Sequence, residues 1–292
     1  MRDFVSAPVV VVGGGPGGAA TAAFLARNGA PVVLFEAERF PRHHVGESLQ
    51  PATFQLLQQH LGLGDGVAAL GFARKYGALY VWGQSREPWS VLFDPRLERD
   101  LPGLTEATLL AGDYERAWQV ERARFDKLLL DHARASGVDV REGTEATSVK
   151  FVDGRAVGVA TAVGDIDASY VIDASGQRAL VGRALDLVEP LEDLRSTATY
   201  AYFDGAGGVP GPLGRHVQLI VTVPEGWAWF IPVSATRTSV GVVVKARSRV
   251  SVEAFLAQLR LAGLLPGADS VAPGSSPPGA APPLAGAVLV DP

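Results

Sequence analysis

The sequence predicts an α/β fold with two parts. The first is an N-terminal domain built on a βαβ unit with a parallel sheet, and the second is a domain with a mostly antiparallel sheet. Three observations predict the βαβ unit: an apolar β-branched run at 8–12, a helical stretch at 16–28 that a glycine closes, and a second apolar run at 31–35. Two parallel strands joined by a helix require a right-handed crossover.

The remaining elements follow from hydrophobic periodicity and from turn residues. We expect helices at 52–60, 122–134 and 252–262, a hairpin at 147–163 that turns at Asp153-Gly154, and single strands at 72–82, 138–140 and 170–174. Further strands are expected at 197–203, 216–223, 227–231 and 238–245.

This pattern gives an expected domain organisation. The first domain covers 1–190, but its segment 70–112 is expected to be inserted into the second domain, which we call the substrate side. The antiparallel sheet and a helix cover 191–262, and 263–292 forms an irregular tail rich in Pro, Gly and Ala.

Composition excludes several classes of function. The chain has 292 residues and a net charge of -5, and it contains no basic block, so we expect no nucleic-acid partner. The absence of cysteine excludes disulfides, thiolate nucleophiles and iron–sulfur clusters, and the five histidines lack the spacing of a metal site. A glycine cluster interrupts the uncharged N-terminal stretch and would break a membrane helix, so we expect a soluble cytoplasmic protein without a membrane partner.

The glycine cluster also fits the G-x-G-x-x-G pattern of a dinucleotide site. Gly13, Gly15 and Gly18 hold the fixed positions, and Pro16 opens the helix. In such a Rossmann-like domain the first glycine makes a tight turn, the second admits a pyrophosphate and the third permits close packing. Glu36 ends the second strand, where a carboxylate accepts hydrogen bonds from both ribose hydroxyls. The alternative is a glycine-rich turn without a ligand.

Two later segments distinguish FAD from NAD. The segment 119–126, Gln-Val-Glu-Arg-Ala-Arg-Phe-Asp, resembles a stretch of many FAD-dependent oxidoreductases in which the residue equivalent to Arg122 lies near the cofactor. The segment 171–176, which contains Asp173 and Gly176, resembles the strand end that passes close to the flavin dinucleotide. The alternatives are a solvated helix charge for Arg122 and an ordinary strand-to-loop turn for Asp173.

Three further features are candidates for the chemistry. Gly46-Glu47-Ser48 precedes a helix, and its glycine would let the loop pass close to a flavin ring, whereas Ser48 could instead be a helix N-cap. Lys75 shares an otherwise small, apolar strand face, which is either exposed or a place where burial lowers the pKa of the amine. Trp227 and Trp229 lie on one face of a strand as a rigid wall or as ordinary packing between sheets.

The segment 226–232, Gly-Trp-Ala-Trp-Phe-Ile-Pro, together with the glycine motif resembles the FAD-dependent halogenase family. In that resemblance Lys75 matches the catalytic lysine, and its surroundings look more like the members that act on phenols, pyrroles or carrier-bound acyl groups than like the free-tryptophan enzymes. The resemblance implies that externally reduced FAD, O₂ and chloride or bromide give hypohalous acid, which Lys75 relays to an aromatic substrate. It also implies that Trp227 and Trp229 keep that substrate off the flavin, and that a separate flavin reductase is a partner.

Two other readings stay open. An aromatic hydroxylase of the same superfamily would consume NADPH and add oxygen, and an inactive flavin-binding fragment would do neither. The family's later G-D motif has Ala287 where its aspartate is expected, so the sequence is expected to be the N-terminal portion of a longer enzyme.

Overall fold

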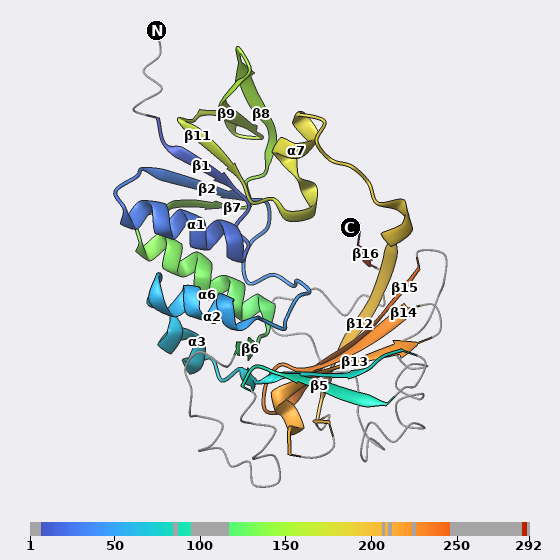
Figure 1. The fold of residues 1–292 in the computed structure, drawn as a ribbon. Coiled ribbons are helices and arrows are strands. Elements are labelled where there is room, and N and C mark those ends of the chain that lie inside the picture. The colour runs from blue at the N-terminus through green and yellow to red at the C-terminus, as the bar shows by residue number, and fades with distance from the viewer. Residues whose placement is uncertain are drawn as a thin grey trace. The chain divides into compact units, whose positions relative to one another are not determined.

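The computed structural model describes residues 7–83, 87–94, 117–205, 208–209, 212–223, 226–245 and 288–290. The chain divides into two compact units, each of which is described by itself. The first unit consists of Met1–His44 and Arg122–Pro190, and the second of Val45–Glu121 and Leu191–Pro292. The segment 45–121 groups with the second unit, where a shorter insertion at 70–112 was expected. Figure 1 labels the elements.

The first unit is centred on a parallel sheet with the strand order β11-β1-β2-β7. Its strands are β1 (Val9–Val12), β2 (Val32–Glu36), β7 (Asp139–Glu142) and β11 (Tyr170–Asp173). Val9 pairs with Val32 on one side and with Tyr170 on the other, and all three neighbouring pairs are parallel. The predicted βαβ unit and the α/β fold class are therefore confirmed.

Helices and a small antiparallel sheet complete this unit. Helices α1 (Pro16–Arg27) and α6 (Arg122–Ala135) pack against each other, as Figure 1 shows. The short helical segments η2 (Gly176–Arg178) and α7 (Leu180–Ala184) follow β11. The small sheet is formed by β8 (Ala146–Val152), β9 (Arg155–Thr161) and β10 (Gly164–Asp167).

The first unit has an apolar core between its two sheets. Side chains of the parallel strands, among them Val10 and Phe35, pack with Val159 of β9 and are at most 1% exposed. The β8–β9 hairpin turns at Asp153 and Gly154, which both have positive φ angles of 49° and 75°. These angles are those of a type I′ turn, as the Asp-Gly pair predicts.

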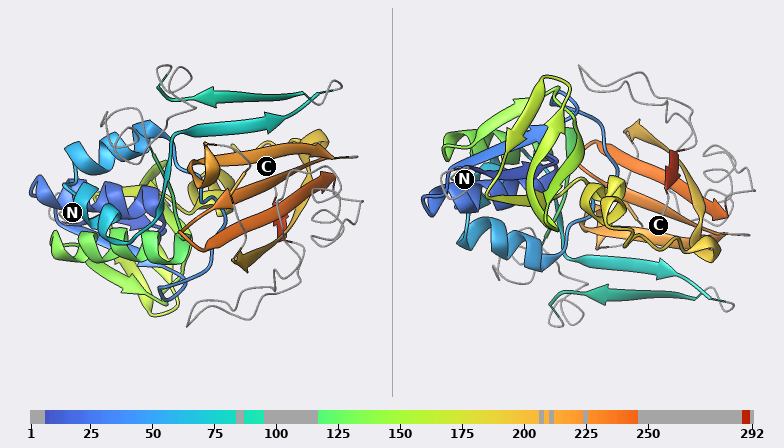
Figure 2. Two further views of the ribbon diagram at one scale, coloured as in Figure 1. Left: turned by 90° about the horizontal axis from the view of Figure 1, so that it is seen from below. Right: turned by 90° about the horizontal axis from the view of Figure 1, so that it is seen from above.

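The second unit contains a seven-stranded sheet with the order β16-β12-β15-β14-β13-β4-β5. Every neighbouring pair is antiparallel except β13 with β4. Its strands are β4 (Gly77–Val81), β5 (Pro88–Leu92), β12 (Ser196–Asp204), β13 (Val217–Val223), β14 (Gly226–Pro232), β15 (Arg237–Lys245) and β16 (Val288–Val290). Figure 2 shows this sheet from two further directions.

Alternating residues divide this sheet into two faces. In β14, Phe230 packs in one apolar cluster with Leu219 and Val242, whereas Trp229 belongs to a different cluster with Ala198. The period of two along β14 therefore places both tryptophans on one face and Phe230 on the other. Shorter elements accompany the sheet: α2 (Pro51–Gln59), α3 (Gly64–Ala69), η3 (Glu192–Leu194), η4 (Gly214–His216) and the pair β3 (Ala73–Lys75) with β6 (Ala117–Gln119).

The expectation of one continuous strand over 72–82 is wrong. The chain leaves the β3–β6 pair at Lys75 and joins the large sheet at Gly77. Between them, the Tyr76 N–H donates to the His216 carbonyl at 2.8 Å instead of to a neighbouring strand. A Cβ atom at Gly77 would lie 2.3 Å from the Val91 carbonyl oxygen, so the close approach of β5 requires glycine there.

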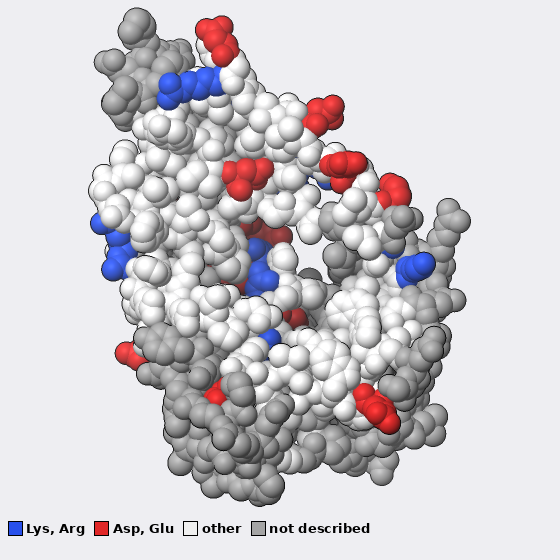
Figure 3. Space-filling view, viewed as in Figure 1, with Lys and Arg blue, Asp and Glu red and all other residues white. Residues whose placement is uncertain are grey.

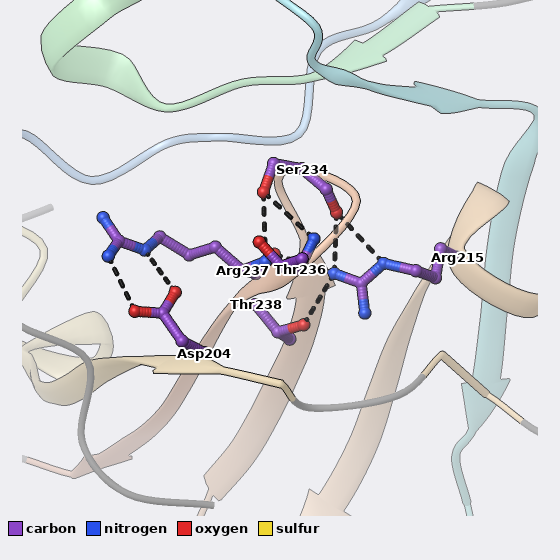
Figure 4. A network of polar contacts seen from close by, with 6 residues as sticks. All are labelled: Asp204, Arg215, Ser234, Thr236, Arg237 and Thr238. Carbon is purple, nitrogen blue, oxygen red and sulfur yellow. Dashed lines mark hydrogen bonds and ion pairs between the residues drawn. The ribbon is translucent and has the colours of Figure 1, made fainter.

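A network around Arg215 holds the turn between β14 and β15 (Figure 4). The Arg215 guanidinium donates to the carbonyls of Ser234 and Arg237 at 2.8 Å and to the Thr238 hydroxyl at 3.1 Å. Beside it, Arg237 forms an ion pair with Asp204 across β12 and β15 at 2.8 Å. Ser234 lies just after β14, the strand that carries both tryptophans. The hydrogen bonds from Arg215 in η4 therefore hold the end of this strand.

Two expectations concern the end of the chain. Val288–Val290 pairs with Ser196–Ala198 as strand β16, so these three residues do not follow the expectation of an irregular tail. The helix expected at 252–262 lies outside the described residues. Across the part of the chain that the structure describes, no helix has the length and apolarity to cross a membrane.

Candidate functional site

The glycine motif of the first unit forms the turn that the sequence predicts. Gly13 has a φ of 104°, and a Cβ atom there would lie 2.3 Å from the Ala174 carbonyl oxygen. A Cβ atom at Gly18 would lie 1.9 Å from the Gly13 carbonyl oxygen, so β1 and α1 pack too closely for any side chain. At Gly15 the backbone is extended, and the nearest neighbour is the Arg42 guanidinium at 3.5 Å from such an atom. Pro16 opens α1.

A cavity of about 780 Å³ lies beside this turn within the first unit. It brings together most of the residues predicted to bind the cofactor: Gly13, Gly15, Pro16, Glu36, Arg122, Asp173 and Gly176. Gly18 supports the turn without lining the cavity. Gly46, Glu47 and Ser48 belong to the second unit.

Backbone hydrogen bonds hold the Glu36 carboxylate at the end of β2. Its Oε2 atom accepts the Gly14 N–H at 2.7 Å, and its Oε1 atom accepts the Glu38 N–H at 2.9 Å. Each carboxylate oxygen has two lone pairs, so each retains an acceptor position. Glu36 is therefore oriented at the cavity with capacity for the two hydroxyls of a ribose.

Two arginines share one buried aspartate at the same cavity. Arg122 binds both oxygens of Asp126 at 2.7 and 2.9 Å, and Arg42 reaches it at 3.2 Å. The Asp126 side chain is fully buried, whereas both arginines line the cavity. Two guanidinium charges against one carboxylate leave a net positive charge, which suits a pyrophosphate. These contacts contradict the alternative in which Arg122 is only a solvated helix charge.

Arg42 was not among the sequence-predicted site residues. It lies in the loop after β2, 84 residues from Asp126 along the chain. A basic residue in the loop that follows the predicted ribose carboxylate was the available signal. Only the tertiary structure brings it beside Gly15.

Asp173 uses its carboxylate to organise the turn after β11. It accepts hydrogen bonds from the Ser175 N–H at 3.0 Å, from the Ser175 hydroxyl at 2.5 Å and from the Val181 N–H at 2.7 Å. Burial acts to raise the pKa of Asp173, but these hydrogen bonds together hold it below its ordinary value. The contacts of Asp173 are therefore those of a strand-to-loop turn. This turn places Gly176, with a φ of 61°, at the cavity.

In the second unit, the segment Gly46-Glu47-Ser48 runs beside β6 like an additional strand. The Val120 N–H donates to the Glu47 carbonyl at 2.8 Å, and the Leu49 N–H donates to the Trp118 carbonyl at 3.0 Å. Gly46 has a φ of 108°, a conformation that glycine adopts readily. Ser48 is not an N-cap, because α2 begins at Pro51 after Gln50.

Lys75 is buried on the small β3–β6 sheet. Its side chain is 1% exposed, its Nζ atom donates to the Leu49 carbonyl at 3.0 Å, and it lies 5.2 Å from the Phe93 ring centre. Burial lowers the pKa of this amine from 10.5 to about 8. Among the described residues, no carboxylate pairs with Lys75, so no opposite charge there offsets the desolvation of the amine. The exposed reading of this strand face is excluded.

The two tryptophans of β14 differ in exposure. Trp229 is 4% exposed, whereas Trp227 is half-buried, and their ring centres lie 5.8 Å apart. The Trp229 indole N–H donates to the Ser239 hydroxyl at 3.0 Å. Trp229 therefore serves as packing in this unit, and Trp227 presents the surface of the pair.

The sequence analysis missed three residues that lie beside the predicted site residues Glu47 and Ser48, namely Tyr202, Ser239 and Gln119. Tyr202 and Ser239 both donate to Glu47, at 2.8 and 3.0 Å. The Ser48 hydroxyl and the Gln119 side-chain carbonyl are buried opposite each other with no hydrogen-bond partner among the described residues. No pattern in the sequence pairs residues this far apart.

Surface charge and metal ligands complete the description. Figure 3 shows acidic and basic residues in small groups among uncharged surface, without a single-signed patch over the described residues of that face. Among the described residues, no group of His, Asp and Glu could hold a metal ion. The donor set of the first unit (a glycine turn, a carboxylate and paired arginines) thus fits a dinucleotide such as FAD.

Comparison with known proteins agrees with this fit. A family model described as an FAD binding domain matches residues 6–247. The chain is 33% identical over 253 residues to the 1H-pyrrole-2-carbonyl-[peptidyl-carrier protein] chlorinase of Pseudomonas fluorescens, covering 82% of this chain and 56% of that protein. It is 34% identical over 250 residues to the tryptophan 2-halogenase of Chondromyces crocatus, covering 82% and 43%. The two relatives, whose names give different substrates, are thus about equally similar to this chain.

A solved structure gives the same relation. The myxobacterial chondrochloren halogenase CndH, an FAD-dependent halogenase, superimposes with a TM-score of 0.74 at 37% identity, over 89% of this chain and 58% of that one. The chain thus spans about half the length of the curated relatives it matches. Its matched segment contains the glycine turn, Lys75 and both tryptophans. The chain belongs to the FAD-binding domain family, and over the matched segment it is similar to flavin-dependent halogenases.

Proposed function

We propose that this chain carries the FAD site and the halogen-relaying lysine of a flavin-dependent halogenase. The reaction takes reduced FAD, O₂ and chloride or bromide and halogenates a small aromatic substrate. The observation that carries the proposal is Lys75, a buried amine whose pKa is lowered to about 8 and which has no carboxylate partner among the described residues. Family membership supports it.

The first unit would hold the cofactor. The Gly15 backbone and the start of α1 would face the pyrophosphate, Arg42 and Arg122 would supply positive charge, and Glu36 would accept the ribose hydroxyls. When bound, reduced FAD supplies the two electrons with which O₂ and a halide ion give hypohalous acid and water. The Gly46–Ser48 segment is proposed to lie near the flavin ring, as the resemblance implies.

Lys75 then relays the halogen. At a pH near 8 about half of this amine is neutral, and its lone pair is available as a nucleophile. The nitrogen attacks the halogen of hypohalous acid, the halogen–oxygen bond breaks, and the hydroxide leaves as water with a proton from the nitrogen. The substrate ring next attacks the halogen, the N–X bond electrons return to nitrogen, and the ring loses its proton. Alternatively, Lys75 holds hypohalous acid by a hydrogen bond.

The tryptophan pair is proposed to separate substrate from cofactor. The Trp227 ring is half-buried and would face the substrate, and the buried Trp229 ring packs beside it. A rigid wall of this kind would exclude direct oxygen transfer to the substrate, which distinguishes the reaction from aromatic hydroxylation.

Partners follow from the same chemistry. A separate flavin reductase would supply reduced FAD, and the cytoplasm, where NADH is available, is the expected compartment. The substrate would be a phenol or a pyrrole. The relative that acts on a carrier-bound pyrrole supports a carrier-bound form.

The test is a bromination assay of the full chain. FAD, a flavin reductase, NADH and bromide are supplied with free and carrier-bound pyrroles and with phenols, and products are examined for the bromine isotope pair. We expect Lys75→Ala and Lys75→Arg to lose at least about 100-fold in rate, because an always-charged guanidinium cannot act as the nucleophile. Lys127→Ala, on the exposed face of α6, should match the wild type.

The outcomes separate the competing functions. Oxygen addition that is independent of halide would establish the hydroxylase and overturn the proposal. Halide-dependent product with Lys75→Ala would remove the role of this lysine. Binding of FAD without any product would favour an inactive flavin-binding fragment.

A further inference from the structure

The Glu47 side chain is buried in the second unit and is held entirely by hydrogen-bond donors. It is 1% exposed. Its Oε1 atom accepts the Tyr202 hydroxyl at 2.8 Å and the Ser239 hydroxyl at 3.0 Å, and its Oε2 atom accepts the Gly46 N–H at 3.0 Å. Among the described residues, no lysine or arginine pairs with Glu47. A buried carboxylate is costly, and three donors offset that cost only while they keep this geometry.

The hydrogen-bond chain continues from Ser239 to Trp229. The Trp229 indole N–H donates to the Ser239 hydroxyl at 3.0 Å, so the Ser239 proton is directed to Glu47. The hydroxyl can satisfy both neighbours only in this orientation. The Glu47 carboxylate therefore orients the Ser239 hydroxyl so that its oxygen accepts the hydrogen bond from the Trp229 indole N–H.

Packing restricts the Trp229 ring in the other directions. Trp229 lies opposite Gly241 on β15, where an added Cβ atom would be 2.2 Å from the ring. The Tyr200 ring centre lies 6.2 Å away on one side, and that of Trp227 lies 5.8 Å away on another. The Trp229 ring fits over Gly241 because this residue has no side chain, and this packing fixes the plane of the ring. The hydrogen bond to Ser239 fixes the rotation of the ring within that plane.

Tyr202 supplies the second donor to Glu47. Burial, followed by the charge of Glu47, raises the pKa of Tyr202, so its hydroxyl stays protonated over the working range of pH. Tyr202 and Glu47 are 155 residues apart, and Ser239 and Glu47 are 192 residues apart. The chain of contacts thus ties the Gly46–Ser48 segment to both β12 and β15.

We propose that Glu47 is a positioning residue that fixes the Trp229 indole, through the Ser239 hydroxyl and with Tyr202 as the second donor. The catalytic meaning rests on the proposed function, because Trp229 supports the wall that Trp227 presents. The positioning itself is independent of FAD, halide and substrate, so it can be tested without the reaction.

The test follows the indole N–H signals of the full chain labelled with ¹⁵N-tryptophan. The sequence has five tryptophans, and Trp229→Phe identifies the relevant signal. In Ser239→Ala the Trp229 signal should shift, and its hydrogen exchange should accelerate at least about tenfold, because the indole loses its acceptor. Glu47→Gln should also shift the signal and accelerate exchange, because its amide NH₂ would face the Gly46 N–H, a second donor.

Two further variants set the scale. Tyr202→Phe keeps the carboxylate and removes one donor, so we expect a smaller shift of the same signal. Thr199→Val removes a hydroxyl from the same strand, β12, on the opposite face, and should leave the Trp229 signal unchanged. Circular dichroism confirms that each variant is folded; if Glu47→Gln does not fold, Tyr202→Phe tests the same carboxylate.

The result that overturns the proposal is a Trp229 signal in Glu47→Gln and Tyr202→Phe with the shift and exchange rate of the wild type. A change in Ser239→Ala alone would assign the indole to Ser239 without Glu47, which also contradicts it. If the indole responds as expected and bromination fails, the positioning stands and only the proposed function falls. If both hold, Glu47→Gln should lower kcat more than it changes KM.

Discussion

The two candidate sites hold their charged groups in opposite ways. In the first unit, Asp126 is paired with two arginines, and backbone N–H groups hold Glu36. In the second unit, Lys75 and Glu47 are both buried without a partner of opposite charge among the described residues. Two guanidinium groups held by one carboxylate suit the binding of an anion such as a pyrophosphate. A buried, unpaired amine changes its protonation near neutrality, which suits chemistry.

The largest expected effect tests the pairing in the first unit. Asp126→Ala would leave the guanidinium groups of Arg42 and Arg122 without their shared buried partner, at a cost of about 3–5 kcal/mol in the free energy of unfolding. Urea unfolding followed by circular dichroism measures it. Asp131→Ala, on the same helix but exposed, is the matched control and should cost less than about 1 kcal/mol. Equal losses would show that the buried pairing has no special weight.

The next effect tests the unpaired amine of the second unit by pH. The folded state lowers the pKa of Lys75 to about 8, so between pH 8 and 10.5 the unfolded chain binds more protons and stability rises with pH. Below pH 8 the wild type carries the full cost of a buried charge. Lys75→Met removes that cost, so its stability relative to the wild type should fall by up to ~3 kcal/mol from pH 7 to pH 10.5.

A matched variant and a direct titration check this pH effect. Lys127→Met changes an exposed amine, and its stability relative to the wild type should stay constant over the same range. The sequence has four lysines, so ¹³C-lysine spectra should show one that titrates near 8 and is absent from Lys75→Ala. Four titrations near 10.5 would contradict the lowered pKa.

A smaller effect concerns the arginines at the cavity of the first unit. Arg42→Ala and Arg122→Ala should each weaken FAD binding about tenfold, because each would remove the charge-assisted contact proposed to the pyrophosphate. Quenching of flavin fluorescence measures the affinity. Arg134→Ala, an exposed position on α6, provides the control. An unchanged FAD affinity of the Arg42→Ala variant would show that Arg42, which the sequence did not predict, does not belong to the site.

The smallest effect concerns an exposed ion pair of the first unit. Lys150 and Asp165 meet at 2.6 Å, but their side chains are 34% and 55% exposed, so water screens their attraction. Lys150→Ala should change the free energy of unfolding by less than about 0.5 kcal/mol. A loss comparable with that of Asp126→Ala would mean that burial does not explain the contrast between the ion pairs.

Local patterns account for what the sequence predicted correctly. The turn at Gly13 and Gly18, the strand that ends at Glu36 and the face shared by Trp227 and Trp229 each depend on residues close together in the chain. Backbone geometry and the period of two decide such features with little help from the rest of the molecule. The same periodicity missed the break at Tyr76, because the bond that ends β3 comes from His216.

The sequence by itself determined the βαβ unit, the glycine turn and the face shared by Trp227 and Trp229, since sterics and spacing act locally. Only the tertiary structure decided that Lys75 is buried, that Arg42 joins the cavity and that Glu47 connects to Trp229. Burial and hydrogen-bond partners come from segments brought together by folding, in this case up to 192 residues apart. The chemistry of each side chain depends on those neighbours.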